Sequence, residues 1–109
     1  MATTYKVLGQ IAPSAASATT AYTVPSATQA VISTITVANR GVDAASFRIA
    51  VRPDGATLEN KHYISYDVAI GANSIVAITC GITADASDVV TVYGSNGNLS
   101  FGVFGTEIA

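Results

Sequence analysis

Two arginines four residues apart are the most distinctive polar residues of this chain. The stretch SFRIAVRPDG, residues 46–55, alternates apolar and polar side chains, and Arg48 and Arg52 fall on the same parity. Such alternation is typical of a β-strand with one buried and one exposed face. The two Cα atoms then lie roughly 13 Å apart, too far for both guanidinium groups to bind one phosphate. Asp67 is the one acidic residue in the middle of an expected strand. We therefore interpret Arg48, Arg52 and Asp67 as a candidate polar seam of ion pairs, between strands or between subunits.

Catalytic chemistry has few candidates in the sequence. His62 is the single histidine and has no neighbours at metal-ligand spacing, so we expect a residue at a loop rim. Cys80 is the single cysteine and lies among apolar residues in SIVAITCGI, which predicts a small buried side chain and excludes an internal disulfide. Neither a nucleophile elbow nor a glycine-rich phosphate loop occurs. We expect no enzyme, no cofactor and no metal.

The composition limits the classes of partner. Charged residues make up 11% of the chain, against about 25% in average proteins, and the formal net charge is −2. This balance predicts binding neither to nucleic acid nor to a membrane surface. A surface with so few charges is poorly protected against association. We therefore favour a subunit of an assembly, the alternative being a monomer coated with Ser, Thr and Ala.

The elements that must position these residues all have strand character. Runs rich in Val, Ile, Thr, Tyr and Phe are separated by Gly, Pro, Asn and Asp, and no segment shows sustained helical periodicity. The expected strands are Thr4–Gly9, Thr19–Val24, Ala30–Asn39, Ser46–Arg52, His62–Ala69, Ser74–Cys80, Val89–Gly94 and Asn98–Phe104. About eight antiparallel strands in 109 residues predict one all-β domain over residues 1–109, a jelly-roll-like β-sandwich.

The connections carry their own expectations. Asn96-Gly97 between two β-rich runs suits a tight turn, so we expect the last two strands to form a hairpin. Residues 84–87 are the one candidate helical turn. Residues 10–19 are rich in small side chains and are expected to form a flexible, arm-like loop.

Alternation within the strands predicts which side chains face inward. The inward candidates are Ile35, Val37, Phe47, Ile49, Val51, Ile64, Tyr66, Val68, Val76, Ile78, Val90, Val92, Leu99, Phe101 and Val103. Several strands, such as AVISTITVA and SIVAITC, are apolar on both parities and lack an obvious solvated face. We infer that one outer face of the sandwich is also covered, by another copy of the chain or by a partner surface.

The order of these segments resembles a known family. AYTVPSATQAVISTITVANRG, ASFRIAVRPDG, HYISYDVAI and GITADASDVVTVYGSNGNLSFGVFGTEI follow one another as in small virion proteins of tailed phages, many of them from phages of cyanobacteria and other aquatic bacteria. The similarity extends from about Tyr5 to Glu107 and brings no catalytic residues with it. One departure is Ala84, where the family commonly has a larger apolar residue.

The resemblance implies a non-enzymatic structural subunit of a phage particle, assembled in the host cytoplasm. We expect an accessory subunit of the decoration or cement type that forms a homo-oligomer, a trimer or another closed ring, and binds other virion proteins such as the major capsid protein. The alternative is a neck, tail-fibre or baseplate component. Such a component could bind carbohydrate or a receptor through loops such as 41–45 or 54–61.

Overall fold

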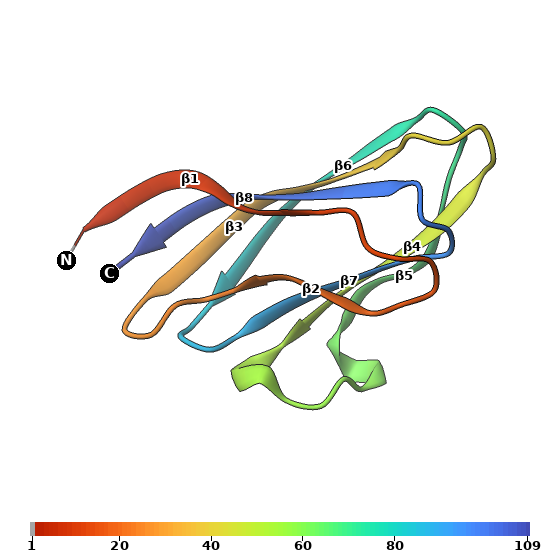
Figure 1. Cartoon of the computed structure of the whole chain (residues 1–109). Helices are drawn as coiled ribbons and strands as arrows, with labels where there is room; N and C mark the ends of the chain where they lie inside the picture. The colour runs from red at the N-terminus through yellow and green to blue at the C-terminus, as the bar shows by residue number, and fades with distance from the viewer. Residues whose placement is uncertain (1) are drawn as a thin grey trace.

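Eight strands in two sheets make up the computed structural model, which describes residues 2–109 (Figure 1). The strands are β1 (Thr3–Ile11), β2 (Thr19–Thr23), β3 (Gln29–Asn39), β4 (Ala45–Arg52), β5 (Tyr63–Ile70), β6 (Ile75–Ala84), β7 (Val89–Gly94) and β8 (Leu99–Ile108). Two short 3₁₀ turns, η1 (Pro53–Gly55) and η2 (Asn60–His62), lie in the connection between β4 and β5. The predicted all-β, eight-stranded sandwich is confirmed.

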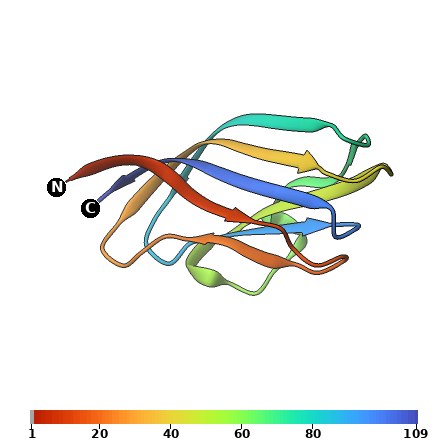
Figure 2. The ribbon, with the colours of Figure 1, turned by 45° about the horizontal axis from the view of Figure 1, so that its top comes forward.

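The strand order is that of a jelly roll. Sheet A has the order β1-β8-β3-β6, sheet B has the order β2-β7-β4-β5, and the neighbouring strands pair in antiparallel fashion. Figure 2 shows the two layers, with β6 at the rim of sheet A. Within the described chain, β4 and β5 are the only consecutive strands that share a sheet. Every other connection carries the chain from one layer to the other.

The expected hairpin of the last two strands is wrong. β7 lies in sheet B between β2 and β4, whereas β8 lies in sheet A between β1 and β3. The turn itself is tight, and the Asn96 side chain accepts a hydrogen bond from the Asn98 backbone N–H (3.0 Å). Each strand is central in its own sheet and has no exposed residue, and the turn bridges the layers.

Several boundaries also differ from expectation. The expected helical turn at 84–87 is wrong, because β6 continues to Ala84 and the Asp88 carboxylate accepts backbone hydrogen bonds from Asp85 and Asp54 (2.8 Å each). β8 runs four residues past its expected end, to Ile108, paired on both sides. The arm-like loop expected at 10–19 is shorter, because residues 10 and 11 belong to β1 and residue 19 begins β2.

The core lies between the sheets and contains most of the predicted inward residues. The confirmed buried side chains are Ile35, Val37, Phe47, Ile49, Val90, Val92, Leu99, Phe101 and Val103. Val76 and Ile78 of the rim strand β6 are partly buried against them. Phe47 of sheet B meets Phe101 of sheet A edge to face, with ring centres 6.3 Å apart.

The inward prediction fails on β5. Ile64, Tyr66 and Val68 are 47%, 55% and 38% exposed. The register with β4 shifts twice, so that Phe47 pairs with Val68 but Ile49 already pairs with Ser65. The extra residues form β-bulges, and the second residue of one bulge, Asp67, has a left-handed backbone (φ 51°). A bulge reverses the alternation, which is why parity placed Tyr66 on the wrong face.

Candidate functional site

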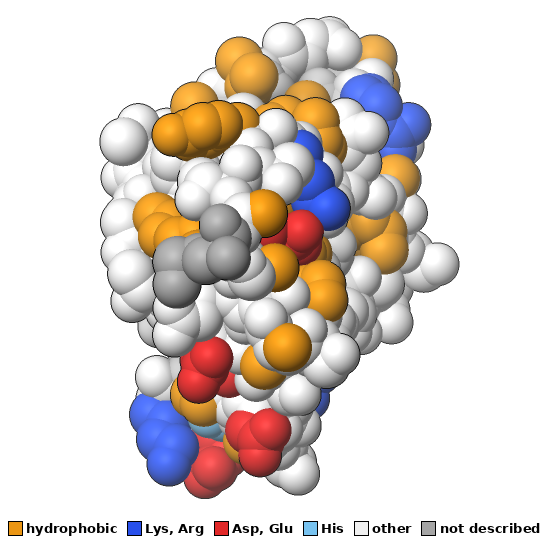
Figure 3. Space-filling model, turned by 90° about the vertical axis from the view of Figure 1, so that its left-hand side faces the viewer, with side chains coloured by type: hydrophobic (Ala, Val, Ile, Leu, Met, Phe, Trp, Pro, Cys, Tyr) orange, Lys and Arg blue, Asp and Glu red, His pale blue; other side chains and the backbone are white. Residues whose placement is uncertain are grey.

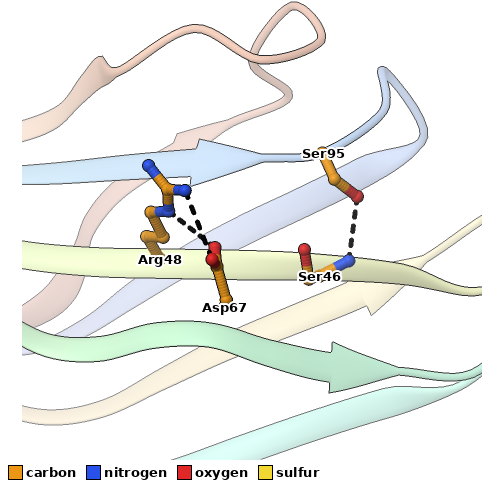
Figure 4. A network of polar contacts seen from close by, with 4 residues as sticks. All are labelled: Ser46, Arg48, Asp67 and Ser95. Atoms are coloured by element: carbon orange, nitrogen blue, oxygen red, sulfur yellow. Dashed lines mark hydrogen bonds and ion pairs between the residues drawn. The ribbon is translucent and has the colours of Figure 1, made fainter.

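The outer face of sheet B carries two of the three predicted site residues as an ion pair. Nε of Arg48 lies 2.6 Å from Oδ1 of Asp67, and its Nη2 lies 3.3 Å from Oδ2 (Figure 4). The bulge in β5 brings the carboxylate beside the guanidinium group of the neighbouring strand. The hydrogen bonds that Arg48 donates to Asp67 raise the pKa of Arg48 above its usual value.

Two tyrosine rings enclose the same guanidinium group. The Cζ atom of Arg48 lies 4.2 Å from the ring centre of Tyr66 and 4.3 Å from that of Tyr93. Both distances are within the range of a cation–π contact. Arg48 is thus fixed by a carboxylate and two aromatic rings that come from the neighbouring strands on either side of β4.

Arg52 does not join this cluster. Its Nε donates to the hydroxyl oxygen of Thr91 (3.0 Å), and its Nη1 donates to the carbonyl oxygens of Gly55 and Ala56 (3.3 and 2.9 Å). These bonds hold the η1 turn against the end of β4. The structure therefore brings Arg48 and Asp67 together and assigns Arg52 to a turn, while a role of the pair between subunits stays a prediction.

A depression lies next to the arginine cluster. It has a volume of about 480 Å³ and is lined by Asn60, Tyr63 and Tyr66. The two tyrosine rings are 4.8 Å apart and nearly perpendicular, at 85°. Sequence reasoning found only part of this site. Asn60 belongs to the loop 54–61 that the sequence suggested for carbohydrate or receptor binding, but alternation placed Tyr66 in the core. The sequence did contain one signal for the irregular strand. A charged residue in the middle of a strand, such as Asp67, is typical of an irregular edge strand.

The other polar candidates have structural surroundings. His62 is buried, and its Nδ1 accepts a hydrogen bond from the backbone N–H of Glu59 (3.0 Å), which closes the η2 turn. Cys80 is partly buried, and burial raises the pKa of its thiol. Among residues 2–109, no three His, Cys, Asp or Glu side chains are grouped to hold a metal ion.

Sheet A differs from sheet B in the charge of its outer face. β3 and β6 contain no charged residue, and the charged residues of β1 and β8 are Lys6 and Glu107. Both point toward sheet B. Nζ of Lys6 lies 2.8 Å from Oε1 of Glu107, whose Oε2 accepts a hydrogen bond from the hydroxyl of Tyr22 in sheet B (2.6 Å). For the residues that the structure describes, the outer face of sheet A is therefore uncharged.

This uncharged face has an apolar component. Its outward side chains include Tyr5, Val7, Val31, Thr34, Thr36, Ile75, Ala77, Thr79 and Phe104. Tyr5 is 82% and Ile75 is 68% exposed.

Figure 3 shows the end of the sandwich that holds the termini. In this view, acidic and basic side chains gather at the bottom, over the β4–β5 connection.

The rim strand β6 leaves an open backbone edge on the same sheet. It pairs with β3 on one side, and its ten residues, IVAITCGITA, contain neither a charge nor a proline. Edge strands in monomeric proteins are usually protected by charges, prolines or bulges. β5, the corresponding edge of sheet B, has two bulges and Asp67. β6 has one register shift, near Gly81, and is otherwise suited to pair with another chain.

Comparisons with known proteins add no relative. No family model, no curated protein and no solved structure matches the chain. The likeness to tailed-phage virion proteins therefore rests on the sequence pattern alone. In residues 2–109 no helix has the length and hydropathy needed to cross a membrane.

Proposed function

We propose that the protein is a non-enzymatic structural subunit that associates with copies of itself and docks on a larger surface. The observation that carries this proposal is the uncharged outer face of sheet A together with its open edge at β6. The sequence pattern adds the context, an accessory subunit of the decoration or cement type on a tailed-phage capsid. The major capsid protein is then the partner surface.

Burying the outer face of sheet A requires little free energy for desolvation. Covering a charged side chain requires desolvation of an ion, and the outer face of sheet A has none to desolvate. Burial of exposed apolar groups such as those of Tyr5, Val7 and Ile75 contributes about 25 cal/mol per Å². At the rim, the free backbone groups of β6 gain hydrogen bonds when a strand of a second copy adds to the sheet.

We assign the β6 edge to a second copy of the chain and the uncharged outer face of sheet A to the particle. A closed ring of three copies needs a heterologous contact, in which the β6 edge of each copy meets a different surface of the next. A subunit that binds the assembled lattice better than the loose one stabilises the shell by mass action. Localisation of the chain in a virion density map distinguishes the capsid from the neck, a tail fibre or the baseplate.

The first test introduces a charge at the β6 edge. Thr79→Lys places an ammonium group on an exposed position of β6, where pairing with a second chain would desolvate it. We expect the wild-type protein to be a trimer by light scattering at high micromolar concentration. The Thr79→Lys variant is expected to shift toward monomer, with a nearly unchanged melting temperature.

The matched control is Thr23→Lys, on an exposed position of β2, which is an edge strand of the other sheet. This variant should keep the wild-type mass. A monomeric wild-type protein that also fails to bind emptied particles would contradict the proposed function. Equal dissociation of both lysine variants would contradict the assignment of the contact to β6.

A further inference from the structure

We propose that the depression lined by Asn60, Tyr63 and Tyr66 is a binding site for a neutral carbohydrate. It lies on the outer face of sheet B, on the opposite side of the sandwich from the uncharged outer face of sheet A. Its volume of about 480 Å³ is within the usual range of small-ligand sites, about 300–1,000 Å³. None of its three lining residues belongs to the uncharged face of sheet A or to β6.

The aromatic walls provide the apolar half of the recognition. The rings of Tyr63 and Tyr66 meet at 85° with their centres 4.8 Å apart, so the depression has two walls at a right angle. A sugar ring has an apolar face of C–H groups and a rim of hydroxyl groups. One aromatic wall can cover the C–H face while the perpendicular wall limits how the ring is oriented.

The polar half comes from groups at the margin of the depression. The phenol hydroxyls and the side-chain amide of Asn60 supply both donors and acceptors, which are the groups that sugar hydroxyls require. The Asp67 side chain next to Tyr66 is 47% exposed. Each of its oxygens accepts one hydrogen bond from Arg48 and keeps further lone-pair capacity for a ligand hydroxyl.

The ion pair of Arg48 and Asp67 favours an uncharged ligand. Arg48 is held by two hydrogen bonds from its guanidinium group to Asp67 and lies between two rings, so its positive charge is balanced where it stands. An acidic sugar would approach the Asp67 carboxylate, and the cation beside that carboxylate, Arg48, is already paired. A neutral sugar carries no charge that the Asp67 carboxylate would repel.

The backbone of β5 at Asp67 also supports a binding site at this depression. Asp67 adopts a left-handed conformation (φ 51°) inside a strand, which is uncommon for a non-glycine residue. The bulge that contains it turns Tyr66 out of the core and sets it against Arg48. Bulges that re-aim a side chain are over-represented next to functional sites.

The test is a binding measurement with neutral oligosaccharides built from glucose, galactose or mannose units and with matched acidic ones. We expect saturable binding of a neutral oligosaccharide by calorimetry or by ligand-observed NMR. Tyr66→Ala should weaken that binding about tenfold or more, and Tyr66→Phe should retain most of it. Asn60→Ala, at an exposed position, gives a second variant if Tyr66→Ala does not fold.

Tyr5→Ala is the matched control, because Tyr5 is an exposed tyrosine on the outer face of sheet A and its removal should leave binding unchanged. The proposal is overturned if no neutral oligosaccharide binds at millimolar concentration. It is also overturned if acidic oligosaccharides alone bind, if a peptide and no sugar occupies the depression, or if binding survives both Tyr66→Ala and Asn60→Ala. The oligomeric state, measured on the same samples, reports separately on the proposed assembly.

Discussion

At the scale of single residues, the polar groups that matter are those that link separate elements. Glu107 near the end of the chain accepts hydrogen bonds from Lys6 near its beginning and from Tyr22 of the opposite sheet. These partners lower the pKa of Glu107, while burial and the neighbouring carboxylate raise the pKa of Tyr22 above its usual value of 10.0. The cluster ties the two sheets together at the end of the sandwich that holds the termini.

The lowered pKa predicts a loss of stability in acid. A carboxyl group whose pKa is lower in the folded state stabilises the fold above its ordinary pKa of 4.5, and this contribution disappears as the pH falls from 4.5 toward the lowered value. We expect the free energy of unfolding to drop in that window. Glu107→Gln should flatten the drop while lowering stability at pH 7. The measurement is urea unfolding between pH 7 and pH 3, and parallel curves for the two proteins would contradict the assigned role.

At the scale of elements, the edge strands β5 and β6 differ in sequence, and this difference explains why one edge is irregular and the other is open. β5 has two bulges and a carboxylate, so its edge is irregular and its tyrosines face outward. β6 is longer and uncharged, so its edge stays open. On the other side of the sandwich, β1 and β2 approach closely, and a Cβ atom added at Gly9 would collide with the carbonyl oxygen of Ala21.

That close approach gives a matched pair of glycine substitutions. Gly9→Ala should cost about 1–3 kcal/mol of unfolding free energy, because β1 and β2 must separate to admit the methyl group. Gly81→Ala, in the edge strand β6, meets nothing within 4 Å and should be nearly neutral. Chemical denaturation of both variants measures the difference. Equal losses would mean that the sandwich does not close tightly at β1 and β2.

At the scale of the whole molecule, the two outer faces have different chemistry. Sheet A presents small polar and apolar side chains without charge, whereas sheet B presents the ion pair of Arg48 and Asp67 among tyrosines. We assign the first face to assembly and the second to a small ligand. Sequence reasoning left open whether the ion pair of Arg48 joins neighbouring strands or subunits. The structure shows it between β4 and β5, and a role between subunits is open to experiment.

Arg48→Ala separates the two roles. If the seam joins subunits, the variant should lose oligomeric mass while its melting temperature changes little. If the pair acts within the chain, the Arg48→Ala variant should keep its oligomeric mass. Its melting temperature should then fall by no more than the melting temperature of the Asp67→Ala variant or of the double variant. Light scattering and thermal unfolding on the same samples distinguish the two outcomes. An unchanged mass leaves the face of sheet B free for a ligand.

The sequence by itself determined, to within a few residues, where the strands lie, and it determined many of the buried residues of β3, β4, β7 and β8. Val51, predicted to face inward, is only partly buried, and Ala50, outside the predicted set, is buried. Both properties are local, because strand propensity and period-two alternation are set by neighbouring residues. The absence of helical periodicity and the low charge density also follow from composition and pattern.

The tertiary structure alone decided how the strands are divided between sheets and which way β5 faces. A tight turn at Asn96-Gly97 is compatible with a hairpin or with a bridge between layers, and the choice depends on partners far away in the chain, β1 and β3 for β8 and β2 and β4 for β7. The position of Tyr66 depends on a bulge that forms only when β5 is paired with β4. The cluster of Arg48, Asp67 and three tyrosines therefore arises from long-range backbone pairing, which alternation along one strand does not encode.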